Sequence, residues 1–281
     1  MRLSDLYLWF LLYSVVGWVY ESMLFTVYYR RPVNRGFLTG PFIPLYGSGG
    51  VMVIALFYGR ITNPAAIFLL ALVLTTALEY ITAVIMENLF QAKWWDYSMF
   101  PLNYKGRIGV ISSLVFATMA LLTLRYVHPQ VERLTNLIPP RHKYLILMLA
   151  TVALLVDLSI TIRHVFILNG RLREIQGALN SFLTTKKRQA GALRQNIMTT
   201  FEESEFYTER IKTLLRLDRR QNARLFRAYP DLRSLRCNEA LGKLKSCVLK
   251  RKDSQSEDDA ASQDATALRE EGGADKKRPG A

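Results

Sequence analysis

Five long apolar stretches set the strongest constraint on what this chain can fold into. A helix needs about 20 mostly apolar residues to cross the hydrocarbon core of a bilayer, where its backbone polar groups must be satisfied within the helix. We therefore predict an all-α fold, a polytopic membrane helix bundle of about five spans within residues 1–169. The predicted spans are Leu6–Tyr29, Phe42–Tyr58, Pro64–Phe90, Ile108–Val127 and Tyr144–Leu168. The second is the shortest and the richest in glycine, so a re-entrant segment is the alternative there.

Charge divides the rest of the chain into two further regions. The formal net charge is +14, and residues 170–252 alone carry 20 Lys and Arg against 8 Asp and Glu. Apolar residues recur there at helical spacing, which predicts a basic cytosolic region of amphipathic helices, arranged as a coiled-coil hairpin or along the membrane. Residues 253–281 have almost no large apolar side chains, so we predict a disordered tail.

Two basic clusters in this region are candidate contacts for anionic lipids or protein partners. A basic side chain near the cytoplasmic surface of a membrane gains about 1 kcal/mol from anionic lipids. The clusters consist of Lys186, Lys187, Arg188, Lys250, Arg251 and Lys252. We expect no nucleic-acid partner, since no recognition motif accompanies the charge and a position next to the membrane already explains it.

Basic residues in the short loops predict the orientation, because such loops stay preferentially on the cytoplasmic side. The region after the fifth span is the most basic, which predicts a cytoplasmic C-terminus and an N-terminus outside. The loops after the first and third spans then lie inside. One connection disagrees, because Arg133, Arg141 and Lys143 fall outside despite their charge.

Two loop motifs lie on the same cytoplasmic face under this topology. They read "NRGFLTGPFIPLYGSG" at residues 34–49 and "WWDYSMFPLNYKGRIG" at residues 94–109. Glycine permits close backbone approach and proline fixes φ, so we expect sharply turned backbone packed against protein at the membrane edge. Ordinary surface turns are the alternative. The candidate residues, with two from the first span, are Gly17, Trp18, Asn34, Arg35, Gly36, Gly40, Pro41, Pro44, Tyr46, Gly47, Trp95, Asp96, Tyr97, Pro101, Asn103 and Gly106.

Four acidic residues lie within the predicted spans, where charge is costly. They are Glu21, Glu79, Glu87 and Asp157. Such groups cost roughly 2.5–3.5 kcal/mol on insertion scales, so they usually face the protein interior and pair with another group. Glu79 and Glu87 share one side of a helix with Ala83, which predicts a polar seam. Candidate partners are Arg35, Lys105 and Arg107. A transport or ligand role and a structural ion-pair cluster both remain open.

The motifs as a set resemble the bacterial ABC-transporter type IV permease family. The resemblance rests on "GWVYE" at residues 17–21, the two loop motifs, the glutamates of the third span and Asp157, and covers roughly residues 1–165. The chain departs from the family after Gly106, where "LVFATM" follows Ser112 and Ser113 in place of Trp-Gly. The resemblance implies a multi-pass protein of the bacterial inner membrane, a permease whose ATPase is a separate subunit.

Other function classes lack their motifs in this sequence. There is no GxxxxGK[ST] loop for ATP, no HExxH, and no paired Cys or His ligands. No nucleophile, base and orienting group converge, so we expect no enzyme activity, no cofactor and no metal. A permease-like transporter subunit is favoured. A membrane scaffold or regulator that binds lipids or proteins through the basic helices is the alternative, and self-association is left open.

Overall fold

The computed structural model describes residues 2–189, 219–242, 244–246 and 248. The chain divides into two compact units, Met1–Glu174 with Arg224–Cys237, and Ile175–Ala223 with Asn238–Ala281. The first unit holds the membrane helices and the two loop motifs. In the second unit, the described contacts include a hydrogen bond from the backbone N–H of Ala240 to Oε1 of Gln176, 3.3 Å long.

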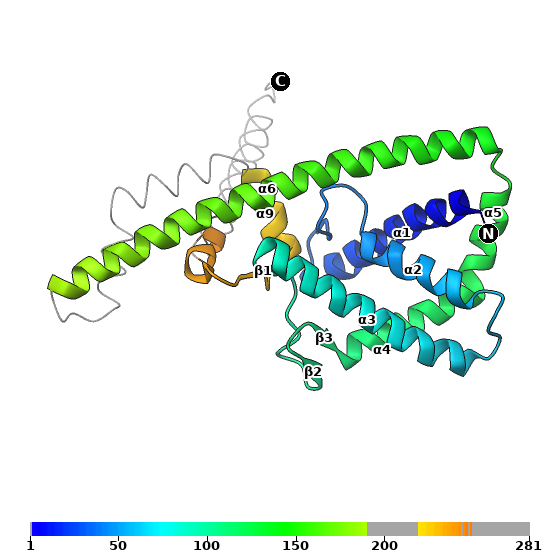
Figure 1. The fold of residues 1–281 in the computed structure, drawn as a ribbon, viewed down its shortest axis with the longest axis horizontal. Coiled ribbons are helices and arrows are strands. Elements are labelled where there is room, and N and C mark those ends of the chain that lie inside the picture. Colours follow the sequence, from blue (N-terminus) through cyan, green and yellow to red (C-terminus); the bar gives the residue numbers. More distant parts are fainter. Residues whose placement is uncertain (1, 190–218, 243, 247, 249–281) are drawn as a thin grey trace, which may run out of the picture. The chain divides into compact units, whose positions relative to one another are not determined.

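Helices make up most of the first unit (Figure 1). The elements of the described chain are α1 Leu3–Tyr29, α2 Pro44–Phe57, α3 Pro64–Phe90, β1 Ala92–Lys93, β2 Asn103–Tyr104, β3 Ile108–Gly109, α4 Val110–Leu122, the π-helical turn η1 Thr123–Val127, α5 His128–Asn136, α6 Pro140–Gln189, α9 Arg219–Ala228 and β4 Arg233–Ser234. The strands form two antiparallel pairs, β1 with β4 and β2 with β3. The protein is therefore mostly helical, as predicted.

Four of these helices are long and apolar enough to cross a membrane. They are α1, α3, the continuous run α4–η1–α5, and α6. The predicted second span is the exception, because α2 has 14 residues and a rise of 1.5 Å per residue gives it only about 21 Å of the roughly 30 Å core. Of the about five predicted spans, four are thus long enough to cross as helices, and the second is the short helix for which a re-entrant segment was the alternative.

Residues 30–43, here called the first loop, connect α1 to α2. The loop leaves the end of α1 and returns to its middle, where the N–H of Ile43 donates to the carbonyl of Ser14 over 3.0 Å. Pro44 then starts α2 at the first helical position, where its missing N–H costs nothing. Residues 91–109, the second loop, likewise lead from the end of α3 back toward its middle. Both return helices, α2 and α4, thus begin part-way along the bundle (Figure 1).

The helix directions define two ends of the bundle. A buried cluster that includes Trp9, Phe57, Ile67 and Leu124 joins the start of α1 and α3 to the end of α2. We call this the N-terminal end. At the other end, the loop end, the ring of Phe37 lies 5.1 Å from that of Phe90 and 4.9 Å from that of Trp94. Both loops therefore lie at one end, as the sequence predicts.

Two helices continue past the predicted limits of their spans. The fourth span was expected to end at Val127, but helix continues to Asn136 through the π-helical turn. That turn ends two residues before Pro129, whose ring nitrogen has no hydrogen to continue the α-helical ladder. The last helix, α6, runs through Gly170 without a break for 50 residues. The boundary predicted at residue 170 is therefore not a helix end.

Small residues let α1 and α2 approach closely. A Cβ at Gly17 would overlap the ring of Tyr46, and one at Gly47 would overlap Ser14 and the carbonyl of Phe10. Helix pairs inside membranes depend on such packing, since lipid supplies little drive for apolar surfaces to associate. These contacts explain the glycines at positions 17 and 47.

An ion pair offsets part of the charge at the N-terminal end. Lys143 Nζ lies 2.7 Å from a carboxylate oxygen of Asp5, and both side chains are largely buried. The connection before α6 carries three basic residues although it was predicted to lie outside. An acid of α1 neutralises one of them, Lys143.

Candidate functional site

Glu79 lies at the centre of the candidate site. It is 3% exposed, and its Oε1 accepts a hydrogen bond of 3.0 Å from the Tyr97 hydroxyl. Its Oε2 lies 3.4 Å from the Ser112 hydroxyl in the first turn of α4. Within the described residues, no Lys, Arg or His side chain forms an ion pair with this carboxylate. The acid is thus held by two hydroxyls without a countercharge.

The second loop holds Tyr97 within hydrogen-bond distance of Glu79. The Tyr97 N–H donates to the carbonyl of Gly106 over 2.8 Å, and Gly106 adopts φ +71, which favours glycine. The amide oxygen of Asn103 accepts from the Gly106 N–H over 3.0 Å. Trp95 closes the same turn by donating to the carbonyl of Arg107 over 3.0 Å. The motif residues of this loop therefore fix the tyrosine that contacts Glu79.

Glu21 occupies the corresponding place on α1, but it has a cationic partner. Arg35 of the first loop lies 3.2 Å from its Oε2, and the Tyr46 hydroxyl donates to its Oε1 over 3.0 Å. The guanidinium carbon of Arg35 also lies 3.8 Å from the centre of the Phe25 ring. The predicted pairing of a loop arginine with an acid of a span is therefore present in the structure.

Glu87 pairs with Arg107, one turn from the loop end. Two guanidinium nitrogens, Nε and Nη2, donate to its Oε2 over 3.0 and 2.6 Å. The hydrogen bond to Glu87 raises the pKa of the Arg107 guanidinium. Glu79, Ala83 and Glu87 are all buried on one side of α3, as predicted. Lys105, the third predicted cation, lies instead over the ring of Tyr104 at 5.3 Å.

Asp157 anchors the first loop to α6. Its carboxylate accepts from the N–H groups of Thr39 and Gly40 over 3.1 and 2.8 Å. On the other side of this turn, Asn34 accepts from the Trp18 indole over 2.7 Å and donates to the carbonyl of Thr39 over 2.8 Å. The four predicted acids therefore do not form one seam, because Asp157 holds loop backbone while the three glutamates lie on α1 and α3.

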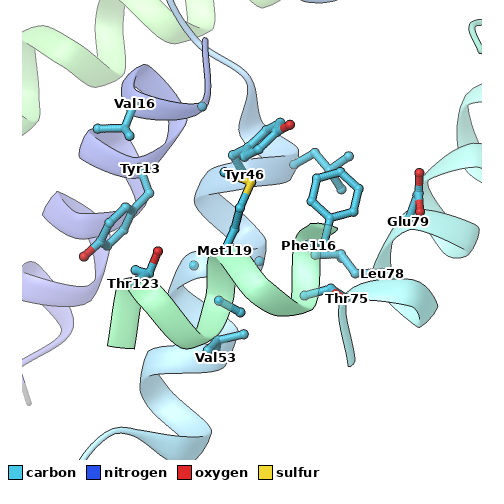
Figure 2. A pocket seen from close by; sticks show the side chains of 15 residues that line it. Tyr13, Val16, Tyr46, Val53, Thr75, Leu78, Glu79, Phe116, Met119 and Thr123 are labelled. Atoms are coloured by element: carbon cyan, nitrogen blue, oxygen red, sulfur yellow. The ribbon is translucent and has the colours of Figure 1, made fainter. Parts of the chain in front are cut away.

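A cavity of about 110 Å³ lies beside Glu79, between α1, α2, α3 and α4 (Figure 2). Glu79 lines it from α3, and the remaining walls are mainly apolar and aromatic. They include Tyr13, Tyr46, Val53, Leu78, Phe116 and Met119. Tyr13, Phe116 and Met119 were not predicted as site residues, because an apolar position that faces a cavity has the same helical spacing as one that faces a core.

Residues 224–237, which we call the docked segment, pack on both loops. Arg224 donates to the carbonyl oxygens of Gly36, Phe37 and Leu38 over 3.2, 3.2 and 2.9 Å. Burial lowers the pKa of its guanidinium, since an apolar environment disfavours the charged form. In return, Arg35 donates to the carbonyl of Ala228. Each of the two segments thus donates an arginine side chain to backbone carbonyl oxygens of the other.

The docked segment contacts the second loop through backbone and aromatic groups. β4 pairs with β1, with Ser234 opposite Ala92. The ring of Tyr229 lies 5.2 Å from that of Trp94, and burial raises the pKa of Tyr229 to about 12. Arg233 lies 3.4 Å from Asp96. Although burial opposes it, the hydrogen bonds from Ser98 and nearby cations lower the pKa of Asp96.

Sequence reasoning missed this docking. Apolar residues of this region were predicted to form amphipathic helices that face lipid or another helix, whereas the segment buries Leu225, Phe226, Tyr229 and Leu232. Of the other predicted residues, Pro41 and Pro101 lie at exposed loop positions. The first predicted basic cluster, Lys186, Lys187 and Arg188, lies within the last turns of α6. The second cluster, Lys250, Arg251 and Lys252, and the predicted disordered tail lie outside the described residues.

The sequence that forms this site matches a known protein family. The family model described as "Putative ABC-transporter type IV" matches residues 8–162, which is more than half of the chain. The chain belongs to this family. No curated protein and no solved structure matches it. The matched residues contain all four acids and both loops, while the docked segment lies beyond them. Together with the four apolar helices, the match establishes a membrane protein and confirms the resemblance seen in the motifs.

Proposed function

We propose that the protein is a permease-like transporter subunit of the bacterial inner membrane. The observation that carries the proposal is the buried Glu79 carboxylate on a cavity between four helices, at a depth where ionisable groups usually mark a pathway or site. Family membership supports transport as the general class. A separate ATPase supplies ATP hydrolysis, and the chain itself is not an enzyme.

In this proposal the loop end faces the cytoplasm. The two loops and the docked segment cover the carboxylates from that side, so a route through the cavity opens only when these contacts rearrange. Rearrangement is plausible for this region because it depends on a few hydrogen bonds and aromatic contacts at loop positions.

Crosslinking of the native complex followed by purification tests the class. A co-purified P-loop ATPase is the expected result for wild type and for Glu79→Gln, because Glu79 is buried and offers no surface to a partner. ATP-dependent uptake or efflux by cells should be abolished by Glu79→Gln and retained by Glu132→Gln. Glu132 is a suitable control because its carboxylate accepts from Tyr58 over 2.9 Å, near the N-terminal end. Full activity of Glu79→Gln, or a complex without any ATPase, would contradict the proposal.

A scaffold function is the second candidate, and the length of α6 favours it. Its 50 residues span about 75 Å, well beyond the roughly 30 Å hydrocarbon core. Such an extension offers a surface to protein partners. If this function holds, replacing Lys186, Lys187 and Arg188 by Gln should release co-purified partners while ATP-dependent transport stays unchanged.

A further inference from the structure

Glu79 differs from the other three predicted acids, because in the described residues neither a cation nor a backbone N–H pairs with it. Glu21 pairs with Arg35, Glu87 pairs with Arg107, and Asp157 accepts two backbone N–H groups. Among the described residues, the hydrogen bonds to the Glu79 carboxylate come from hydroxyl groups alone. An ionised carboxylate away from water is unfavourable without a countercharge. A cation from outside the protein would complete this site.

The space beside Glu79 has room for an organic group. The cavity of about 110 Å³ is several times the roughly 10–15 Å³ that one water needs and approaches the ~150 Å³ of an engineered cavity that binds benzene. Its walls are mainly apolar, which favours an apolar body over a cluster of waters. Tyr13, Tyr46 and Phe116 add aromatic rings, whose faces attract cations.

A metal ion fits the same site poorly. Divalent cations need several carboxylate, carbonyl, imidazole or thiolate ligands. The described residues contain no group of three or more His, Cys, Asp and Glu that could hold a metal ion. One carboxylate beside apolar and aromatic walls suits a single positive charge on an apolar molecule.

We propose that this cavity binds a small organic monocation, with its ammonium group against Glu79 and its apolar body between Tyr13, Phe116 and Met119 (Figure 2). The inference rests on the proposed transport function, for which it names the substrate class. The hydroxyls of Tyr97 and Ser112 hold the carboxylate in place, and Glu79 also lines the cavity, where the ligand would meet it.

Equilibrium binding to the purified full chain in lipid nanodiscs tests the proposal. The probes are benzylammonium and benzyl alcohol, which match in size and differ in charge. Wild type should bind benzylammonium at least about tenfold more tightly than benzyl alcohol, since a hydrogen bond to a charged group adds about 1.5–3 kcal/mol. Glu79→Gln should remove this preference, and Glu132→Gln should retain it.

A second variant keeps the test decisive if Glu79→Gln does not fold. Met119→Trp fills the cavity without changing Glu79, so it should weaken the binding of both probes. Equal binding of the two probes to wild type, undiminished benzylammonium binding by either variant, or no binding at all would overturn the proposal. Since binding is measured without an ATPase, its failure leaves the result of the complex purification intact, and the proposed function is judged separately.

Discussion

At the residue scale, the structure separates three acids that pair with an arginine or with backbone N–H groups from Glu79, which hydrogen-bonds to two hydroxyls. Glu87 and Glu21 each receive an arginine from a loop, and Asp157 receives loop backbone. Sequence position alone predicted that all four are buried or paired, because charge within a span is costly. It could not predict which arginine meets which acid, since that depends on how each loop folds back along its helix.

The Glu87–Arg107 pair gives a prediction about stability. Arg107→Gln leaves the Glu87 carboxylate, which is 9% exposed, without its cation. We therefore expect the free energy of unfolding to fall by about 1–3 kcal/mol, with a lower melting temperature in detergent. The double variant Glu87→Gln with Arg107→Gln should lose less, because no buried charge is left unpaired. A double variant less stable than Arg107→Gln would show that the pair does not act in this way.

The close approach at Gly47 gives a second prediction at this scale. Gly47→Val would overlap Ser14 and the Phe10 carbonyl, and overpacking of this kind typically costs about 1–3 kcal/mol. Gly170→Ala is the control, because a Cβ there meets nothing within 4 Å and alanine favours a helix. Thermal unfolding should show a clear decrease for the first variant and none for the second. Equal melting temperatures would contradict the packing described here.

At the element scale, the same arrangement occurs twice. α1 and α3 each run from the N-terminal end to the loop end, a loop returns along each, and α2 and α4 each start part-way (Figure 1). Hydropathy and length predicted all of the long helices, because the membrane requires apolar helical spans. Hydropathy marked the second span as the shortest but placed its start too early, since the apolar residues Phe42 and Ile43 of the first loop extend the same stretch. The docking of residues 224–237 depends on tertiary contacts that periodicity does not contain.

The docked segment should hold the two loops together. Arg224→Gln removes the charged donor of three hydrogen bonds to first-loop carbonyls, so amide hydrogen exchange should rise in residues 36–40 and 91–96. Arg236→Gln, an exposed position of the same segment, should leave exchange unchanged. If exchange in the loops is the same in both variants and in wild type, the segment does not stabilise them.

At the scale of the whole molecule, the central claim is that both loops, the docked segment and the covered acids face the cytoplasm. Labelling of single cysteines with a membrane-impermeant maleimide tests it directly, with Cys237 and Cys247 replaced by Ser. Met99 in the second loop is 86% exposed, and Leu137 at the N-terminal end is 78% exposed. Met99→Cys should be labelled only in inverted membrane vesicles, and Leu137→Cys only in intact cells with a permeable outer layer. Labelling of Met99→Cys from the outside, or of both positions from one side, would contradict the account.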